Sequence, residues 1–397
     1  MSRLGKLRRI ALDRQGLLKS DGFGRGKAAA LRAIEHLGYV QIDTISVVQR
    51  AHHHVLWSRI GNYQPVFLER LMRERKIFEY WFHAAAWLPM RDYRFALPRM
   101  AQINGNRGWF PDGDRRLMAE ILRRIETEGP LRARDFEDSR AGNSGWWDWK
   151  PAKRALEQLF MQGELTVSRR DGFQKVYDLP ERVLPGWVDT RCPDADEFAR
   201  YLIDTTLRAH GFATARSITY LRTGRPLRDA VRDELAARID AGSLIELALR
   251  GRDTIYLDPE LLESRAPRCP ARVGILSPFD NSVIQRARVR DFFDFDYQIE
   301  CYLPSSRRQF GYFCLPLLYR DRYVGRIDCK AHRDQARLEI RKLHLERRVD
   351  EQFIPALDRA LWSFAEFNSC DNLSFGCATA ARLIIDRKMP RRRSAHV

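Results

Sequence analysis

Two polar side chains near the N-terminus, Gln41 and Asp43, are spaced so that they could act together on one substrate. The stretch 39–45 reads as a short strand between two helices, and side chains two residues apart on a strand share a face. A fixed carboxylate stabilises a forming cation and accepts a proton from water, while a neighbouring carboxamide holds that water in line. The pattern therefore predicts Asp43 as the charge-stabilising base and Gln41 as its water-positioning partner.

A simpler interpretation of the same two residues remains open. Asp is a favoured residue at helix N-termini, where its carboxylate accepts hydrogen bonds from free backbone N–H groups. Asp43 could therefore cap the following helix, with Gln41 merely exposed on the surface.

Three consecutive histidines follow, between two arginines. Neighbouring residues on a helix point about 100° apart, so three adjacent histidines are poorly placed to share one metal ion. We therefore predict no metal site and no cofactor. One or two of the histidines, together with the arginines, are predicted to line a DNA path, the alternative being buried, hydrogen-bonded imidazoles; the residues are Arg50, His52, His53, His54 and Arg59.

The charge balance points to a polyanionic partner. The 397 residues contain 69 Lys and Arg against 52 acidic residues, which gives a net charge of +17. Basic side chains release counterions when they bind nucleic acid, so this composition favours a nucleic-acid partner, although a generally basic surface would look similar.

Composition also limits the class of protein. The hydrophobic fraction of 44% is ordinary for a globular chain, and the length suffices for about two to four domains. No apolar run reaches membrane-spanning length, and the N-terminus lacks the apolar core of a signal peptide. The seven scattered cysteines indicate free thiols, so we expect a cytoplasmic protein.

Two segments repeat the order helix, Gly, strand, polar turn, strand, Pro. In the first copy the helix precedes Gly163, and in the second it precedes Gly242; in both a Tyr follows the Gly by 14 residues. A helix followed by a two-stranded hairpin is the latter half of a winged helix, and the Gly suits a left-handed helix end. Helices near 115–128 and 197–210 complete the two copies, and helices near 5–18 and 26–37 suggest a weaker third.

The first clear copy carries basic residues where a winged helix contacts phosphate, at the start of its recognition helix and on its wing. We predict DNA contacts from Lys150, Lys153, Arg154, Arg169, Arg170 and Lys175. A solvated surface is the competing interpretation.

The pattern changes after about residue 271. Alternating segments at 297–303, 323–329 and 337–345 predict strands of a small antiparallel sheet or barrel, with a bulge near Arg341-Lys342. A helix over about 350–367 is expected to cap it, and Arg391-Arg392-Arg393 reads as a basic tail.

Five motifs in one order resemble the winged-helix DNA glycosylases of the YcaQ/AlkZ type. They are Gln41-Ile42-Asp43, Arg50-Ala51-His52-His53, Tyr80-Trp81-Phe82-His83, Ser277-Pro278-Phe279-Asp280-Asn281 and Arg307-Arg308-Gln309-Phe310-Gly311-Tyr312. The resemblance covers roughly residues 5–365. It implies an α+β fold of tandem winged helix-turn-helix domains, with the count of three resting on the resemblance, followed by a C-terminal antiparallel β-barrel-like domain. The expected domains are 1–110, which carries the Gln-x-Asp motif, then 111–188, 189–270 and 271–397.

The resemblance also implies an activity. Such enzymes remove alkylated purines and unhook interstrand crosslinks. This chain has Asp rather than Gln at the second motif position, and in this respect it resembles the crosslink-unhooking branch of the family. No Lys stands out as a Schiff-base nucleophile, so a monofunctional hydrolase with Asp43 and Gln41 at its centre is expected. The expected partner is double-stranded DNA carrying alkylated or crosslinked purines, bound by a bacterial, nucleoid-associated monomer. The alternative is a non-catalytic winged-helix transcriptional regulator, although no dimer seam is evident.

Overall fold

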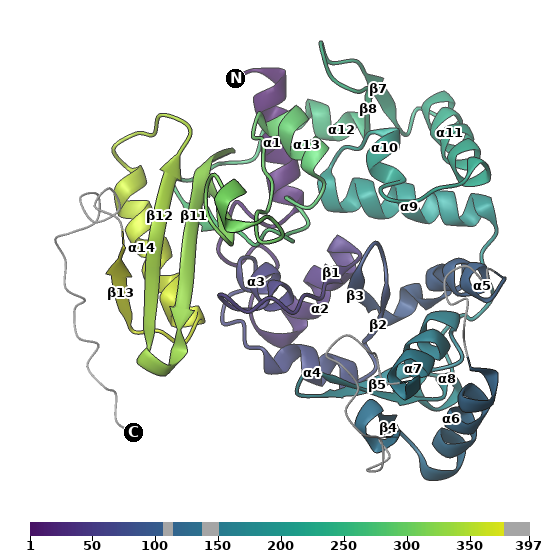
Figure 1. The fold of residues 1–397 in the computed structure, drawn as a ribbon. Helices are drawn as coiled ribbons and strands as arrows, with labels where there is room; N and C mark the ends of the chain where they lie inside the picture. The colour runs from purple at the N-terminus through teal and green to yellow at the C-terminus, as the bar shows by residue number, and fades with distance from the viewer. Residues whose placement is uncertain (106–113, 137–150, 377–397) are drawn as a thin grey trace.

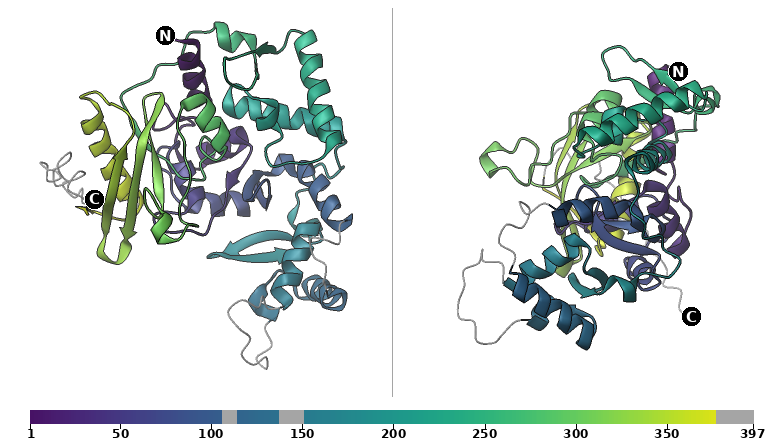
Figure 2. Two further views of the ribbon diagram at one scale, coloured as in Figure 1. Left: turned by 45° about the horizontal axis from the view of Figure 1, so that its top comes forward. Right: turned by 90° about the vertical axis from the view of Figure 1, so that its right-hand side faces the viewer.

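The computed structural model describes residues 1–105, 114–136 and 151–376. Helix-rich units and a β-rich C-terminal part follow one another along the chain (Figure 1), so the expected α+β class is confirmed. Figures 1 and 2 show the N-terminal unit in the middle, the α9–α11 unit and the α6–α7 unit on opposite sides of it, and the C-terminal sheet flanking it. Over these ranges no helix is both long enough and apolar enough to cross a membrane.

The Gln-x-Asp stretch lies in the N-terminal unit, whose sheet has the order β1-β3-β2. Its elements are α1 (Arg3–Arg14), α2 (Gly26–Leu37), β1 (Val40–Gln41), α3 (Ala51–Trp57), α4 (Val66–Arg73), β2 (Ile77–Trp81), β3 (Ala85–Pro89), η1 (Met90–Ala96) and α5 (Leu97–Gly105). Gly38, at φ 81°, ends α2 in the left-handed conformation and turns the chain into β1. Gln41 pairs with Ala86 of β3, and the Ile42 N–H still donates to the Ala85 carbonyl over 2.8 Å. The strand is therefore shorter than predicted, and Asp43 lies just beyond its ladder.

Helix followed by hairpin recurs in the next two units, as the repeat predicts. The second unit contains α6 (Arg115–Glu128), β4 (Leu131–Arg132), η2 (Ala133–Phe136), α7 (Pro151–Gln162), β5 (Thr166–Asp171), β6 (Gln174–Asp178) and α8 (Pro180–Val183). The third contains α9 (Ala195–His210), α10 (Ala215–Ile218), α11 (Arg225–Asp240), β7 (Ile245–Leu247), β8 (Ile255–Leu257) and α12 (Pro259–Glu263). Gly163 (φ 83°) and Gly242 (φ 71°) both follow their helices in the left-handed conformation. The assignment of three winged helices stays a prediction.

The C-terminal sheet has the order β13-β12-β11-β10-β9 in the described part of the chain. This part contains β9 (Val273–Ile275), α13 (Arg286–Phe293), η3 (Ser305–Arg307), β10 (Cys314–Tyr319), β11 (Arg322–His332), η4 (Arg333–Gln335), β12 (Arg337–Leu345), α14 (Phe353–Phe367) and β13 (Asn372–Phe375). The predicted bulge is confirmed. Cys329 pairs with Ile340 and Asp328 pairs with Lys342, so Arg341 has no partner residue on β11. The expected purely antiparallel pairing is wrong at one edge, where β13 runs parallel to β12. The basic tail lies outside the described residues.

The strand predicted at 297–303 is absent, and the segment is an irregular loop. Tyr297, at its start, is buried in the core, and the Tyr297 hydroxyl donates to the Cys314 carbonyl over 2.6 Å. Further along, the Glu300 carboxylate accepts the backbone N–H groups of residues 309, 310 and 311 at 2.8–3.1 Å. One side chain therefore replaces a strand ladder as the partner of this loop's backbone.

The hydrophobic core joins the units rather than separating them. Tyr80 of β2 and Phe160 of α7 belong to one buried cluster, and the Tyr80 hydroxyl donates to the Met161 carbonyl over 2.6 Å. Leu7 of α1 packs with Phe212 and Phe292 of later segments. These clusters cross the predicted domain boundaries, which remain predictions, and they hold the N-terminal unit against its neighbours.

Candidate active site

Asp43 is fixed by the backbone that follows it. Its carboxylate Oδ1 accepts the Ile45 N–H over 2.7 Å, which is a local turn rather than a helix cap. The next helix, α3, begins at Ala51 with Arg50 before it, so the helix-cap interpretation of Asp43 is wrong. The side chain is half-buried and the following Thr44 is exposed, so the carboxylate lies at an accessible edge of the N-terminal unit.

The surroundings of Asp43 alter its acidity. Burial raises the pKa of the Asp43 carboxyl above its ordinary value, and the hydrogen bond from the Ile45 N–H opposes this shift in part. A raised pKa makes the carboxylate a better proton acceptor than a free Asp side chain.

Gln41 is held by a histidine. Its amide oxygen lies 3.1 Å from His83 Nε2, and both side chains are largely withdrawn from solvent. Burial lowers the pKa of His83 to about 4, helped by the charge of Arg222, so the imidazole is neutral near pH 7. With Nε2–H donating to the amide oxygen, the Gln41 –NH₂ group remains to donate toward an oxygen at the site.

A loop from the C-terminal part approaches Asp43. Burial and the negative charge of Asp43 both raise the pKa of the Cys301 thiol. The neighbouring Tyr302 feels the same carboxylate, yet its side chain is 73% exposed. Hydrogen bonds from the backbone of residues 309–311 to the Glu300 carboxylate hold this loop in place. The exposed Tyr302 ring therefore lies near Asp43, where it is available to stack on a base.

A cavity of about 780 Å³ gathers many of the predicted DNA-contact residues. It lies between α3, α4 and the β5–β6 hairpin, and Ile42 of the Gln-x-Asp motif is on its wall. The predicted residues that it brings together are Arg50, His52, His53, Arg169 and Arg170. Residues more than 100 positions apart in sequence thus share one basic hollow next to the candidate catalytic pair.

Pairing inside this hollow decides which cations are available. Arg170 makes a bidentate ion pair with buried Glu79 at 2.7 and 2.8 Å, and Lys175 lies 3.0 Å from Glu157. Arg169 is 55% exposed and contacts only the wing-tip Asp171 carboxylate among the described groups. Arg170 and Lys175 therefore stabilise the hairpin through these ion pairs, whereas Arg169 is more available for phosphate. DNA contact by all three residues stays a prediction.

Arg50 also faces the hollow. Its guanidinium lies 4.3 Å from the centre of the Phe173 ring, with Arg170 at 4.6 Å from the same ring. Arg50 has no carboxylate partner in the described ranges, so its charge is available to a polyanion. Its role as a DNA contact remains a prediction.

Burial corrects two other predicted DNA contacts. Arg59 is 0% exposed and forms a bidentate ion pair with Asp280 at 2.7 and 2.8 Å. His54 is also buried, and its Nε2 lies 2.8 Å from the Ile275 carbonyl. Both residues tie the N-terminal unit to the C-terminal part, so neither can reach DNA.

The other two histidines of the triplet, His52 and His53, are neutral near pH 7. Burial lowers the pKa of His53 to about 4, with Arg50 adding to the shift, and the ring contacts the Tyr63 hydroxyl at 2.8 Å. Burial likewise lowers the pKa of His52. These rings line the hollow as uncharged surfaces, and in the described segments no three His, Cys, Asp or Glu side chains converge as a metal site would require.

The start of α7 carries the remaining predicted contacts. Lys153 and Arg154 are exposed there, and their contact with DNA stays a prediction. Lys150 lies outside the described residues.

Three residues of the site escaped sequence reasoning: His83, Tyr302 and Glu300. His83 belongs to one of the quoted motifs, but nothing in the sequence shows that it meets Gln41, which lies 42 positions away. Tyr302 and Glu300 fall in a segment whose alternation mimics a strand.

Comparison with known proteins shows the family of this chain. The family model for AlkZ-like DNA glycosylases matches residues 34–367. Among solved structures, Streptomyces sahachiroi DNA glycosylase AlkZ is similar in fold, with a TM-score of 0.64 and 18% sequence identity over 94% of this chain and 98% of that one. The family match contains the candidate catalytic pair, the basic hollow and most of the C-terminal sheet. The chain therefore belongs to the AlkZ-like family of DNA glycosylases.

Proposed function

We propose that this protein hydrolyses the N-glycosidic bond of N7-alkylated purines in double-stranded DNA, and that it acts on interstrand crosslinks as well as monoadducts. The observation that carries the proposal is the anchored pair at the edge of the N-terminal unit: half-buried Asp43, fixed by Ile45, and Gln41, fixed by His83. The basic hollow beside it supplies charge for the phosphate backbone.

Release of an N7-alkylated purine does not require a general acid. Alkylation at N7 makes the purine cationic, so it leaves as a neutral base without protonation. The sugar that remains resembles an oxocarbenium ion, and a nearby carboxylate stabilises that charge. In the proposed step the oxygen of water bonds to the sugar carbon, the glycosidic electron pair leaves with the base, and Asp43 accepts the water proton. Gln41 orients that water.

The openness of the site supports action on crosslinks. A base tethered to the opposite strand cannot swing freely into a deep pocket, as flipped bases do in many glycosylases. Asp43 lines neither the cavity of about 450 Å³ nor the cavity of about 780 Å³. A carboxylate at an accessible edge suits a substrate that stays in or near the duplex.

Base release tests the proposal directly. We expect the protein to free N7-methylguanine from a duplex and to separate the strands of a nitrogen-mustard crosslink. A monofunctional enzyme leaves an abasic site that breaks only on treatment with alkali, and borohydride should trap no covalent protein–DNA adduct. Folded protein that binds both duplexes yet releases no base would instead favour a transcriptional regulator.

The activity should depend on pH through Asp43. Because burial raises the pKa of this carboxyl, it becomes protonated at a higher pH than an ordinary Asp, whose pKa is about 4. Protonation removes both the negative charge and the proton acceptor, so kcat/KM should fall as the pH drops, with a midpoint above about 4. Single-turnover rates between neutral and acidic pH measure this fall in activity. A rate that stays constant down to the ordinary pKa of Asp, about 4, would contradict the role assigned to Asp43.

His83 should act through Gln41 as a positioning residue. His83→Phe removes the hydrogen bond to the amide oxygen, and losing one such bond is expected to lower kcat about tenfold. In a Gln41→Ala background the same replacement should have almost no further effect, because its partner is already gone. Independent effects of the two substitutions would show that His83 does not work through Gln41.

A further inference from the structure

One loop of the C-terminal part presents two large aromatic side chains to solvent. The segment 300–312, which contains η3 and precedes β10, has Tyr302 at 73% exposed and Tyr312 at 37% exposed. Single exposed rings are common on protein surfaces, but two rings in one short loop beside a candidate catalytic group indicate a contact surface. We therefore examined what this loop could bind.

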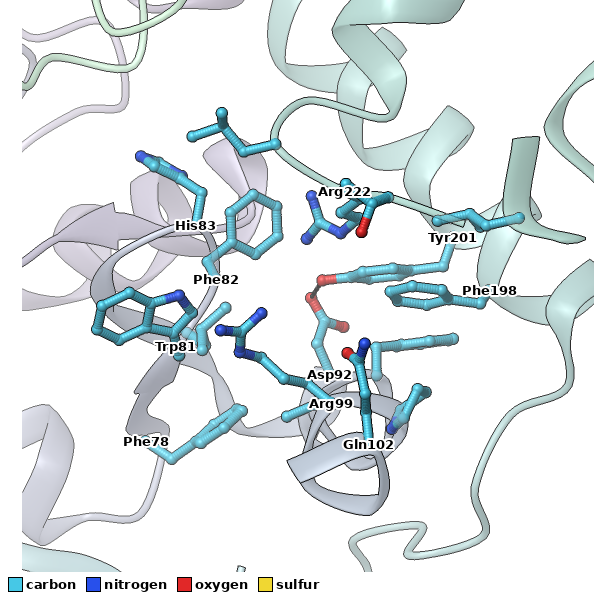
Figure 3. A pocket seen from close by; sticks show the side chains of 17 residues that line it. Phe78, Trp81, Phe82, His83, Asp92, Arg99, Gln102, Phe198, Tyr201 and Arg222 are labelled. Carbon is cyan, nitrogen blue, oxygen red and sulfur yellow. Dashed lines mark hydrogen bonds between the residues drawn. The ribbon is translucent and has the colours of Figure 1, made fainter. Parts of the chain in front are cut away.

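The Tyr302 ring is open to a partner. In the described ranges no other aromatic ring or guanidinium group packs on it. The aromatic side chains around the cavity of about 450 Å³ beside His83 are different (Figure 3). There Tyr201 stacks on Phe95 with ring centres 3.8 Å apart, and Phe82 contacts other side chains of the protein. Tyr302 therefore offers a ring for stacking, whereas the rings of that cavity are engaged within the protein.

The loop that carries Tyr302 is held in place by more than the Glu300 carboxylate. The Tyr312 N–H donates to Asp328 Oδ2 over 3.3 Å, and a β-carbon added to Gly311 would collide with the same carboxylate. Arg308 Nε donates to the Leu303 carbonyl over 2.9 Å and so connects the two halves of the loop. A loop that is already ordered loses little conformational entropy when it binds, so the exposed ring is pre-organised.

The loop also lies beside the candidate catalytic carboxylate. Cys301 packs on the same hydrophobic cluster as Ile45, the residue whose N–H fixes Asp43. Partial burial raises the pKa of the Tyr302 hydroxyl, and Cys301 and the negative charge of Asp43 add to the shift. Charges act on exposed groups only over short distances in salt solution. Packing and charge therefore agree that Tyr302 is near Asp43.

Arg307 adds a cation to the same loop. Its side chain is exposed at the end of η3, and no carboxylate forms an ion pair with it in the part of the chain that the structure describes. Arg308 is different, because its guanidinium lies 4.9 Å from the Tyr312 ring centre and braces the loop. An open ring and an available guanidinium group match the two parts of a nucleic-acid strand, the base and the phosphate.

We infer that Tyr302 stacks on the base next to the damaged nucleotide, and that Arg307 binds a nearby phosphate of the duplex. For the sugar of the damaged nucleotide to reach Asp43, that nucleotide must move partly out of the base stack, which uncovers a face of the neighbouring base. Tyr302, held beside Asp43, covers this face and stabilises the displaced arrangement. The inference rests on the proposed function, because it takes Asp43 as the point of attack.

A duplex that mimics the reaction product tests the contact without base release. It carries one tetrahydrofuran abasic analogue with 2-aminopurine as the neighbouring base, whose fluorescence falls when it stacks. We expect the wild type to quench this fluorescence. Tyr302→Ala should bind the duplex about tenfold more weakly and should not quench it at saturation, because the ring is lost. Tyr302→Phe keeps the ring and should behave as the wild type.

The matched control is Trp187→Ala, which removes another exposed ring, at 60%, from the segment between α8 and α9. It should bind and quench as the wild type does. Both alanine variants alter exposed side chains, so their melting temperatures should stay close to that of the wild type. Arg307→Met should reduce the salt dependence of binding while the bound duplex stays quenched.

Three results would overturn the stacking contact: no quenching by the wild type, full quenching by Tyr302→Ala, or an equal loss in Tyr302→Phe. An unchanged salt dependence in Arg307→Met would exclude the phosphate contact. Wild-type protein that quenches 2-aminopurine yet releases no base from a methylated duplex would contradict the proposed glycosylase activity and leave the stacking contact standing. Base release without quenching would do the reverse, so the two proposals can fail separately.

Discussion

Asp43→Asn is expected to lower the rate of N7-methylguanine release by about 10²- to 10⁴-fold, the range found when a general base or a transition-state charge partner is removed. Asn has nearly the same shape and can still accept the Ile45 N–H, so the local turn should survive. What disappears is the negative charge beside the forming oxocarbenium ion and the acceptor for the water proton. Single-turnover release from a methylated duplex measures the effect.

Stability and DNA affinity serve as internal controls for this variant. The folded-state pKa of Asp43 is raised, so its ionised form costs stability at neutral pH, and that cost vanishes when the carboxyl is protonated. Asp43→Asn should therefore melt at the same temperature as the wild type or higher. Affinity for duplex DNA should change by no more than about twofold, as for most surface substitutions.

Asp240→Asn is the matched control, since this Asp is exposed at the end of α11 in another unit. It should release base at the wild-type rate. Full activity in Asp43→Asn would remove Asp43 from the mechanism, whereas loss of activity in both variants would point to a general effect of charge.

Arg59→Met is expected to destabilise the fold by about 3–5 kcal/mol, the usual cost of removing one partner from a buried ion pair. Asp280 would be left 0% exposed without its cation. Although burial favours its neutral form, Arg59 and the hydrogen bonds of Ser282 outweigh that effect and hold the pKa of Asp280 below its ordinary value. Urea unfolding of the wild type and the variant measures the difference.

Two further variants show whether the pair itself is responsible. Asp280→Asn should be destabilising to a similar extent, because it leaves the guanidinium unpaired. The double variant Arg59→Met/Asp280→Leu should recover part of the loss, since apolar groups of similar size often replace a buried pair at little cost. Additive losses in the double variant would contradict the pairing.

The same variant tests a corrected expectation about DNA. Replacing a cationic side chain that binds phosphate lowers the salt dependence of DNA binding, but buried Arg59 cannot reach phosphate. Under conditions where Arg59→Met is folded, its salt dependence should match that of the wild type. Arg169→Met, which removes an exposed wing cation, should lower it.

The sequence determined much of the local structure. The Gly that ends α7 and the Gly that ends α11 were placed correctly because only a residue without a β-carbon adopts the left-handed conformation at little cost. The bulge at Arg341 followed from one slip in the alternation of β12, because a pleated strand places every second side chain on one face. The Gln-x-Asp spacing indicated the candidate catalytic pair for the same local reason.

Only the tertiary structure decided which side chains meet. Arg59 and Asp280 lie 221 positions apart, and nothing in either neighbourhood distinguishes a buried pair from an exposed DNA contact. Arg170 forms an ion pair with Glu79, 91 positions away, which the sequence around neither residue indicates. The loop at 297–303 has the alternation of a strand but no neighbouring strand, and the Glu300 carboxylate accepts the backbone hydrogen bonds of residues 309–311 instead. Local backbone conformation depends on consecutive residues, whereas burial and ion pairing depend on long-range packing that no single segment determines.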